Sequence, residues 1–122
     1  MLDLDNFKNI NDQFGHAVGD SALVKMAELL RQACKGGDDF IGRMGGDEFI
    51  VVGERRETAE IKQLMNKIYA SCLAYNKRKQ AEYFLLPSMG YSVFENEDKM
   101  DTFLATADQV MYRNKQEKKL AR

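Results

Sequence analysis

Apolar residues recur every three or four positions in three segments of the chain and predict three amphipathic helices. The first helix runs from Asp20 onward and ends at Gly36-Gly37, because adjacent glycines stop a helix. The second covers Ile61–Cys72 and precedes a solvated basic run, Lys77-Arg78-Lys79. The third has Asp101 as its N-cap. The apolar positions that carry these patterns are Leu23, Met26, Ala27, Leu30, Ala33 and Cys34, then Ile61, Leu64, Met65, Ile68 and Cys72, then Phe103, Ala107 and Met111.

Two β-type runs flank a glycine pair in the middle of the chain. Phe40–Arg43 and Phe49–Val52 are short and apolar, and Gly45-Gly46 lies between them. Glycine adopts positive φ without steric cost, so this pair predicts the turn of a β-hairpin. The carboxylates of Asp47 and Glu48 then lie at the hairpin tip, where a ligand can reach them. A bare turn would explain the glycines and Asp47 alone.

Further strands are expected near both ends of the chain. Met1 to Leu4 reads as the end of a buried strand that begins abruptly, which suggests an N-terminally truncated domain. Tyr83–Leu86 and Met89–Phe94 form a last strand region. Pro87 must bend this region or lie at a sheet edge, because proline has no ladder donor. Residues 5–19 are rich in Asn, Asp and Gly and are predicted to form an irregular loop or connector.

The order of these elements predicts an α+β fold, in which helices flank one mostly antiparallel sheet. The length of 122 residues fits a single domain, residues 1–122. A chain of this length can form a hydrophobic core without disulfides or a structural metal. We therefore expect one compact catalytic or binding domain.

Composition and charge exclude several classes of protein. The formal net charge is −1, so the chain lacks a general basic field for a nucleic-acid polymer, and phosphate binding must be local. Cys34 and Cys72 lie in helical patterns and predict reduced, buried thiols in a cytoplasmic protein. His16 is the single histidine, which argues against a zinc site. No apolar run approaches the ~20 residues that span a bilayer, so no membrane contact is expected.

Acidic residues also mark the end of the first strand. Asp3 and Asp5 are two positions apart and therefore project to the same side, with the Leu4 carbonyl near them. If this strand end lies beside the hairpin tip, Asp3 and Asp47 can share metal ions. Carboxylates are hard oxygen ligands that suit Mg²⁺ held against a phosphate. An N-cap or turn role explains Asp5 equally well.

Several spaced motifs together resemble the GGDEF family of diguanylate cyclases, over nearly the whole chain and in the same order. The resemblance implies a nucleotidyl-cyclase or palm-like, ferredoxin-like sandwich whose N-terminal helix and first strand start are absent here. The matching residues are Asp3-Leu4-Asp5-Asn6-Phe7-Lys8, Asn11-Asp12, Phe14-Gly15-His16, Gly19-Asp20, Arg43-Met44-Gly45-Gly46-Asp47-Glu48-Phe49, Ala107-Asp108, Tyr112 and Lys115.

The resemblance implies that two GTP molecules condense into cyclic di-GMP and release two pyrophosphates. Each protomer holds one GTP and two protomers face each other, so a homodimer is the active unit. Such domains act in bacterial signalling, in the cytoplasm, behind an upstream sensory or receiver module that can tether them to a membrane protein. The sequence contains no such module.

By the same resemblance, the cofactor is Mg²⁺, or Mn²⁺ in its place, held by Asp3, the Leu4 carbonyl and Asp47. Glu48 helps to hold it or supports the ligands, and Asp47 also accepts the proton of the attacking hydroxyl. Lys8 stabilises charge on the phosphates. The backbone amides from Asn6 through Phe7 to Lys8 cup the phosphates. An exposed surface lysine is the ordinary interpretation of Lys8.

Asn11 and Asp20 match the pair that reads guanine in the family. A carboxylate accepts hydrogen bonds from the guanine N1–H and 2-amino groups, which adenine lacks. An N-cap role remains open for Asp20, and one residue can do both.

Lys115 and Lys119 match the family's phosphate-binding lysine and arginine on the last helix. Lysine at position 119 loses bidentate phosphate recognition, and a basic frayed tail that includes Arg122 explains it equally well. Lys118 replaces the usual glycine. Arg43 and His16 are interpreted as structural groups, in a buried ion pair or bracing a loop.

One departure concerns regulation. Family members carry Arg-x-x-Asp shortly before the glycine pair, where the product binds and inhibits. Gly36 and Asp39 stand at these positions here. We therefore predict no strong product inhibition through that site, and micromolar or tighter binding of cyclic di-GMP there in titration calorimetry would refute this.

Two alternatives stay open. A degenerate or truncated domain could bind GTP and regulate a partner without turnover, although the predicted catalytic residues are present. A sister enzyme that makes mixed guanine–adenine dinucleotides is disfavoured by Asp20, because those relatives are expected to carry a small hydroxyl residue there.

Overall fold

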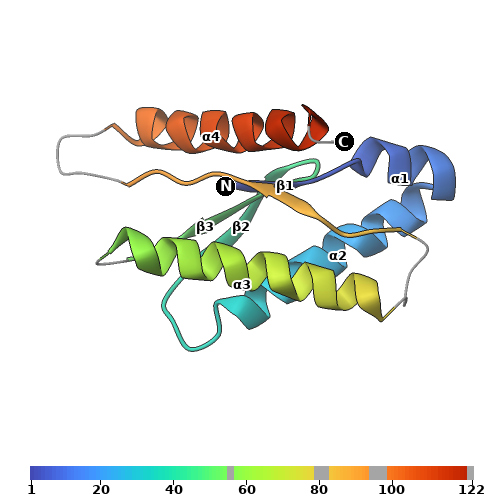
Figure 1. The fold of residues 1–122 in the computed structure, drawn as a ribbon, viewed down its shortest axis with the longest axis horizontal. Coiled ribbons are helices and arrows are strands. Elements are labelled where there is room, and N and C mark those ends of the chain that lie inside the picture. The colour runs from blue at the N-terminus through green and yellow to red at the C-terminus, as the bar shows by residue number, and fades with distance from the viewer. Residues whose placement is uncertain (55–56, 79–82, 94–98, 121–122) are drawn as a thin grey trace.

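The computed structural model describes residues 1–54, 57–78, 83–93 and 99–120. Strands and helices are interspersed along the chain (Figure 1). In chain order they are β1 Leu2–Leu4, α1 Phe7–Phe14, α2 His16–Ala33, β2 Phe40–Gly45, β3 Glu48–Val52, α3 Thr58–Lys77, β4 Pro87–Met89 and α4 Met100–Leu120.

The described strands form a four-stranded antiparallel sheet in the order β2-β3-β1-β4. β2 and β3 are the predicted hairpin around Gly45-Gly46. β1 lies in the middle of the sheet, where Leu2 pairs with Phe49 and with Met89. The α+β class and the mostly antiparallel sheet predicted from the sequence are therefore confirmed.

The helices cover both faces of this sheet. In Figure 1, α4 lies on one side of the strands, and α2 and α3 lie on the other. Leu2 and Leu4 of β1 belong to the apolar core with α2 and α3. Asp3 and Asp5 alternate with these leucines and bond to lysines of α4. The strand period of two thus separates the core from the charged residues.

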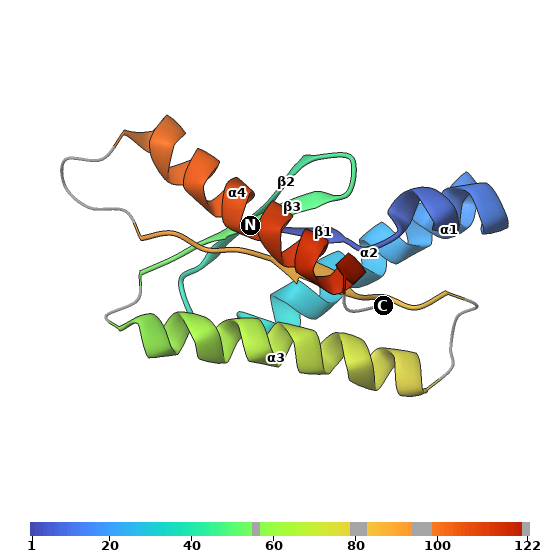
Figure 2. The ribbon, with the colours of Figure 1, turned by 45° about the horizontal axis from the view of Figure 1, so that its top comes forward.

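α4 lies very close to β4. A Cβ atom on Gly90, just after β4, would overlap the backbone of α4 at Ala107 and Met111. Figure 2 shows α4 passing in front of β1 and β4. Because no side chain separates the two backbones at Gly90, the residues of α4 that face the sheet reach the end of β1.

The segment 5–19 was predicted to be an irregular loop, and this prediction is wrong. It forms α1, and α2 already begins at His16, with Gly15 between the two helices at a φ of 94°. Ile10 is buried, and Phe7 and Phe14 pack against the core. Tertiary packing of these apolar residues, spaced three or four apart, overrides the loop preference of the Asn, Asp and Gly residues.

Two smaller predictions also need correction, whereas the predicted helix end at the basic run is confirmed. Asp101 is not an N-cap, because α4 begins at Met100 and Asp101 lies in its first turn. The last strand is limited to Pro87–Met89, at a sheet edge as its proline required; Phe94 lies outside the described residues. α3 ends at Lys77, and Lys79 is not described.

Both cysteines are buried, as predicted. Cys72 lies in the core with its sulfur 3.9 Å from that of Met26. Burial raises the pKa of the Cys72 thiol to about 12, which keeps it protonated and unreactive. Within the described parts of the chain, no helix combines the length and the apolarity needed to cross a bilayer.

Candidate active site

The end of β1 lies beside the hairpin tip, which is the condition under which Asp3 and Asp47 could share a metal ion. Asp3 pairs with Glu48 in the sheet, and the backbone N–H of Leu4 donates to the carbonyl of Asp47 at 3.3 Å. The turn itself needs glycine, because Gly46 has a φ of 52°. The side chain of Arg43 braces this turn by donating from Nε to the Gly46 carbonyl at 2.8 Å. Asp3, Asp47 and Glu48 are thereby brought together.

Asp3 is buried, and its two oxygens differ. Lys115 Nζ donates to Oδ2 at 3.2 Å, whereas Oδ1 is buried without a hydrogen-bond partner. Burial raises the pKa of the Asp3 carboxyl, and the neighbouring charges of Asp47 and Asp5 add to this against the opposing effect of Lys115. Burial and the charges of Asp108, Asp3 and Asp47 also raise the pKa of Glu48. This region disfavours further negative charge and favours a cation.

A divalent cation fits this region. No group of three or more Asp, Glu, His or Cys side chains converges as a metal cluster in the described parts of the chain. The set predicted from the sequence is different, since it combines the Asp3 and Asp47 carboxylates with the Leu4 carbonyl. The buried Asp3 Oδ1, which lacks a partner, is an oxygen ligand of the type that Mg²⁺ prefers.

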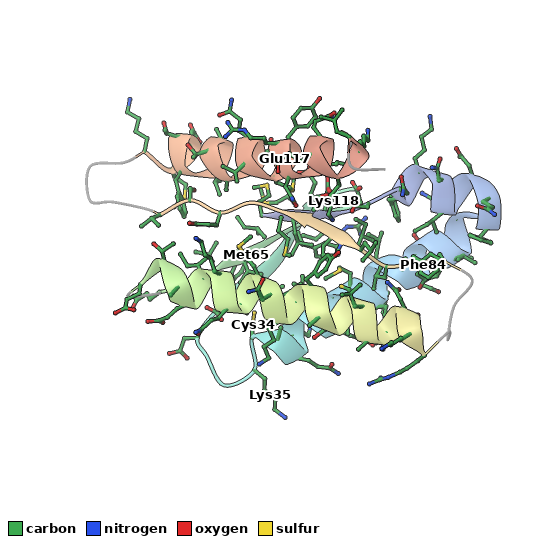
Figure 3. All side chains as sticks on the ribbon, viewed as in Figure 1. Cys34, Lys35, Met65, Phe84, Glu117 and Lys118 are labelled. Carbon is green, nitrogen blue, oxygen red and sulfur yellow. The ribbon has the colours of Figure 1, made fainter. Side chains whose placement is uncertain are left out.

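A second lysine of α4 holds Asp5, the residue that follows β1 directly. Lys118 Nζ donates to Asp5 Oδ2 at 2.7 Å and to the carbonyl of Pro87, and it lies over the ring of Tyr69. Ser88 Oγ donates to Asp5 Oδ1. Figure 3 shows Lys118 on the side of α4 that faces the sheet. This network joins α4 to β1, β4 and α3.

The backbone turns sharply between β1 and α1. Asn6 has φ 58° and ψ 27°, a left-handed conformation that asparagine tolerates better than most residues. α1 begins at Phe7, so the backbone N–H groups of Phe7 and Lys8 belong to its first turn and have no partner within the helix. The Asn6 and Lys8 side chains are exposed, and Phe7 packs against the core. This geometry suits an anion at the start of the helix.

Asn11 and Asp20 lie on neighbouring helices. The side chain of Asn11 packs against Gly19, where a Cβ atom would overlap Asn11 Oδ1. Asn11 Oδ1 is buried and has no hydrogen-bond partner. Asp20 follows Gly19 directly and is exposed. Because Asn11 packs against Gly19, the two predicted base-reading residues lie at neighbouring positions of α1 and α2. Because α2 starts at His16, the N-cap interpretation of Asp20 is wrong.

Comparison with known proteins settles the family. The family model "Diguanylate cyclase, GGDEF domain" matches residues 1–120. The chain belongs to the GGDEF family.

Among relatives of this GGDEF domain, the diguanylate cyclase DgcP of Escherichia coli is 38% identical over 120 residues, which are 97% of this chain and 35% of DgcP. DgcP of Pseudomonas aeruginosa is 35% identical over 94% of this chain and 17% of its own length. The GGDEF domain therefore spans about a third or less of these two relatives.

A solved structure of the GGDEF domain of TpbB (YfiN) from Pseudomonas aeruginosa superposes on this GGDEF domain with a TM-score of 0.82. The two are 30% identical, and the match covers 95% of this chain and 69% of that one. The predicted family and fold class are both confirmed by these matches.

Lys119 of the GGDEF domain is exposed and lies within α4, so it is helical and does not belong to a frayed tail. Arg122 is not described. Lys119 lines a shallow cleft beside α4. His16 is exposed at the start of α2, and Arg43 is exposed, so neither forms the buried ion pair considered from the sequence. The cleft is lined by Asp3, Glu48, Asp101, Thr102, Ala105, Thr106, Asp108, Gln109, Met111, Tyr112, Lys115, Gln116 and Lys119.

The loop before β2 has a conformation that suits its own glycine. Gly36 has a φ of 90°, which L-residues rarely adopt, and no atom lies near its Cβ direction. An arginine at this position of the GGDEF domain would strain the same backbone. The backbone at position 36 therefore favours glycine over the arginine that other family members carry there.

A separate apolar cavity of about 530 Å³ lies between the sheet, α3 and α4. Ile50, Leu64 and Phe103 are among the residues that line it, and none of the predicted catalytic, substrate or metal residues does. The carboxylates predicted to hold a metal ion therefore lie outside this cavity.

Sequence reasoning missed the roles of Lys118 and Ser88. Lys118 was noted only as a departure from a usual glycine, and Ser88 was not considered. No local pattern links either residue to Asp5, because the partners are 113 and 83 positions apart.

Proposed function

We propose that this GGDEF domain is a diguanylate cyclase that condenses two GTP molecules into cyclic di-GMP and releases two pyrophosphates. One observation carries the proposal. Among the described residues, the buried side-chain oxygens without a hydrogen-bond partner are Asp3 Oδ1 and Asn11 Oδ1. Unpartnered buried oxygens are costly, so each is best explained by a ligand. The resemblance to the GGDEF family implies a metal on Asp3 and guanine on Asn11.

Each residue has a role in the proposed reaction. Asp3, Asp47 and the Leu4 carbonyl hold Mg²⁺, or Mn²⁺ in its place, with support from Glu48. The bound cation supplies positive charge against the phosphates and acidifies the attacking 3′-hydroxyl. Asp47 accepts the proton of that hydroxyl. Asn11 and Asp20 select guanine.

In each half-reaction, a ribose 3′-oxygen forms a bond to the α-phosphorus of the other GTP. The bond from that phosphorus to its bridging oxygen breaks, and pyrophosphate leaves. Lys8, the α1 N-terminus after Asn6, Lys115 and Lys119 balance the charge on the phosphates and the leaving group. Because each GTP supplies both a nucleophile and a phosphorus, two copies of the domain face each other in the proposed homodimer.

We further propose that the domain belongs to a larger signalling protein of the cytoplasm. The relatives it matches are about three or more times longer, and one is named as a bifunctional diguanylate cyclase and cyclic di-GMP phosphodiesterase. The additional length leaves room for an upstream sensory or receiver module. The burial of the Cys72 thiol in the apolar core is consistent with a reducing compartment.

The test is to incubate the purified chain with GTP and Mg²⁺ and to look for cyclic di-GMP by mass spectrometry. We expect product from the wild type and none from Asp47→Ala, which should still fold and bind GTP. GTP binding without product from the wild type, at concentrations that allow dimers, would favour the regulatory alternative.

A further inference from the structure

We propose that Lys115 neutralises Asp3 when no divalent cation is bound and is displaced by the cation, so that cation and nucleotide bind cooperatively. The part of this inference that concerns the nucleotide rests on the proposed function. Lys115 thereby has two successive partners, Asp3 first and the phosphates afterwards.

The charge around Asp3 requires a positive group. Asp3 is only 7% exposed, and the carboxylates of Asp47 and Glu48 belong to the strand and turn beside it. Lys115 Nζ is 3.2 Å from Asp3 Oδ2, and the Lys115 side chain is 26% exposed. A buried carboxylate with acidic neighbours is stabilised by such an ammonium group. A divalent cation ligated by Asp3 would supply the same compensation.

The two cannot share Asp3 without repulsion. A cation on Asp3 would lie beside the Lys115 ammonium group, and like charges this close oppose each other. The contact between Lys115 and Asp3 is a single hydrogen bond at 3.2 Å, longer than the usual 2.7–2.9 Å of charge-assisted bonds. Lys115 is therefore held less tightly on Asp3 than Lys118 is on Asp5, where the corresponding distance is 2.7 Å.

The helix does not have to move when Lys115 leaves Asp3. Lys118, three positions further along α4, bonds to Asp5 at 2.7 Å and to the Pro87 carbonyl. Gly90 keeps the α4 backbone against β4 at Met111. A change in the side-chain torsions of Lys115 is enough to redirect its ammonium group into the cleft that it lines.

Cooperativity follows from this exchange. A cation that binds alone must displace the ammonium group and leave it near the new positive charge without a partner. A nucleotide supplies phosphate oxygens to that ammonium group, so the cation then binds with less opposition. By linkage, the cation improves nucleotide affinity by the same factor.

The decisive experiment titrates Mn²⁺ without nucleotide and follows free Mn²⁺ by electron paramagnetic resonance. We compare the wild type with Lys115→Met and with Lys119→Met, which removes an equal charge one turn further along the same cleft. We expect Lys115→Met to bind Mn²⁺ roughly tenfold tighter and Lys119→Met to change affinity much less. Equal effects of the two substitutions, no tightening by Lys115→Met, or no Mn²⁺ binding by any protein would overturn the proposal.

Thermal unfolding provides a second readout and detects a folding defect. We expect Lys115→Met to have a lower Tm than the wild type without cation and a larger gain in Tm on adding Mn²⁺. Equal gains in the two proteins would contradict displacement. Lys115→Gln, which keeps a polar side chain, should behave like Lys115→Met if the charge is what matters.

Repeating the titration with a non-hydrolysable GTP analogue separates this inference from the proposed function. The analogue should tighten Mn²⁺ binding to the wild type more than to Lys115→Met. Failure of the analogue to bind would refute the proposed function and the nucleotide step, whereas the nucleotide-free titration would still decide whether Lys115 competes with the cation.

Discussion

Asp3 in β1 and Asp5 directly after it lie two positions apart, bond to the same helix and differ in how completely their oxygens are bonded. Both are 7% exposed, and each is paired with a lysine of α4. Asp5 has a partner on each oxygen, Lys118 on one and Ser88 on the other. Asp3 has Lys115 on one oxygen and no partner on the other. An incomplete polar network in β1 thus lies beside a completed one in the turn that follows it.

The difference separates structural residues from residues that await a ligand. A buried network that satisfies every member fixes the geometry of its elements. A buried polar atom without a partner costs free energy, and natural proteins keep such atoms mainly where function requires them. Asn11 Oδ1 is in the same condition as Asp3 Oδ1. Similar burial therefore has opposite meanings at Asp3 and Asp5.

The largest expected effect is on the completed network. Lys118→Met should keep the packing of the side-chain stem on Tyr69. It would leave the buried Asp5 carboxylate without the lysine ammonium group, which costs about 3–5 kcal/mol of unfolding free energy. Urea unfolding followed by circular dichroism measures this change. Adding Asp5→Asn to Lys118→Met should recover a large part of the loss. A loss below about 1 kcal/mol would mean that the pair is screened like a surface salt bridge.

The next effect is on the incomplete network. Asp3→Asn should lower kcat/KM for cyclic di-GMP synthesis at least about 100-fold, because it removes a charged ligand of the cation that stabilises the transition state. The far-ultraviolet circular dichroism spectrum should stay that of the wild type. Near-normal turnover by Asp3→Asn would show that Asp3 is structural, like Asp5.

A smaller effect is expected at the second unpartnered oxygen. Gly19→Ala places a methyl group where the Asn11 amide now lies. Displacing that amide should raise KM for GTP roughly tenfold with little change in kcat, since it weakens base binding. Overpacking should also cost about 1–3 kcal/mol of stability. Steady-state kinetics at several GTP concentrations measures KM and kcat. An unchanged KM would show that Asn11 does not take part in base recognition.

The smallest effect is on the thermal stability of the cation-free protein and its dependence on pH when Asp3 is replaced. The pKa of Asp3 is raised in the folded protein, so ionised Asp3 destabilises the fold without cation. Asp3→Asn should therefore raise the Tm of the cation-free protein at pH 7. The gain should shrink as pH falls through the folded pKa of Asp3 and vanish below its unfolded pKa, where Asp3 is protonated in both states. A constant gain from pH 7 to pH 3 would contradict this account.

The sequence predicted the elements whose signals are local. Glycines at 45 and 46 with apolar neighbours were enough for the hairpin, and helical spacing was enough for α2, α3 and α4. The proximity of Asp3 to the hairpin tip was expected and is confirmed by its pairing with Glu48. The residue roles at the site stay predictions, because comparison with relatives establishes the family and not the chemistry of each side chain.

The errors lie where tertiary contacts decide the outcome. Residues 7–14 form α1 because Ile10 and its apolar neighbours reach the core, although the polar residues between them favour turns. The bonds of Lys118 could not be anticipated, because its partners come from β1 and β4. Which of Asp3 and Asp5 keeps a free oxygen also depends on Ser88, a residue with no signal of its own.

The ion pairs that α4 makes with Asp3 of β1 and with Asp5 just after it also bear on how the domain folds. They join residues 112 and 113 positions apart, nearly the full length of the chain. Contacts of such long range form only after a large loop has closed, and they slow folding relative to local contacts. The hairpin and the helices can form early from neighbouring residues, whereas the charged site needs both the first strand and the last helix. We infer that the site is completed late in folding, so a partly folded chain would carry its structural elements before its charged site is complete.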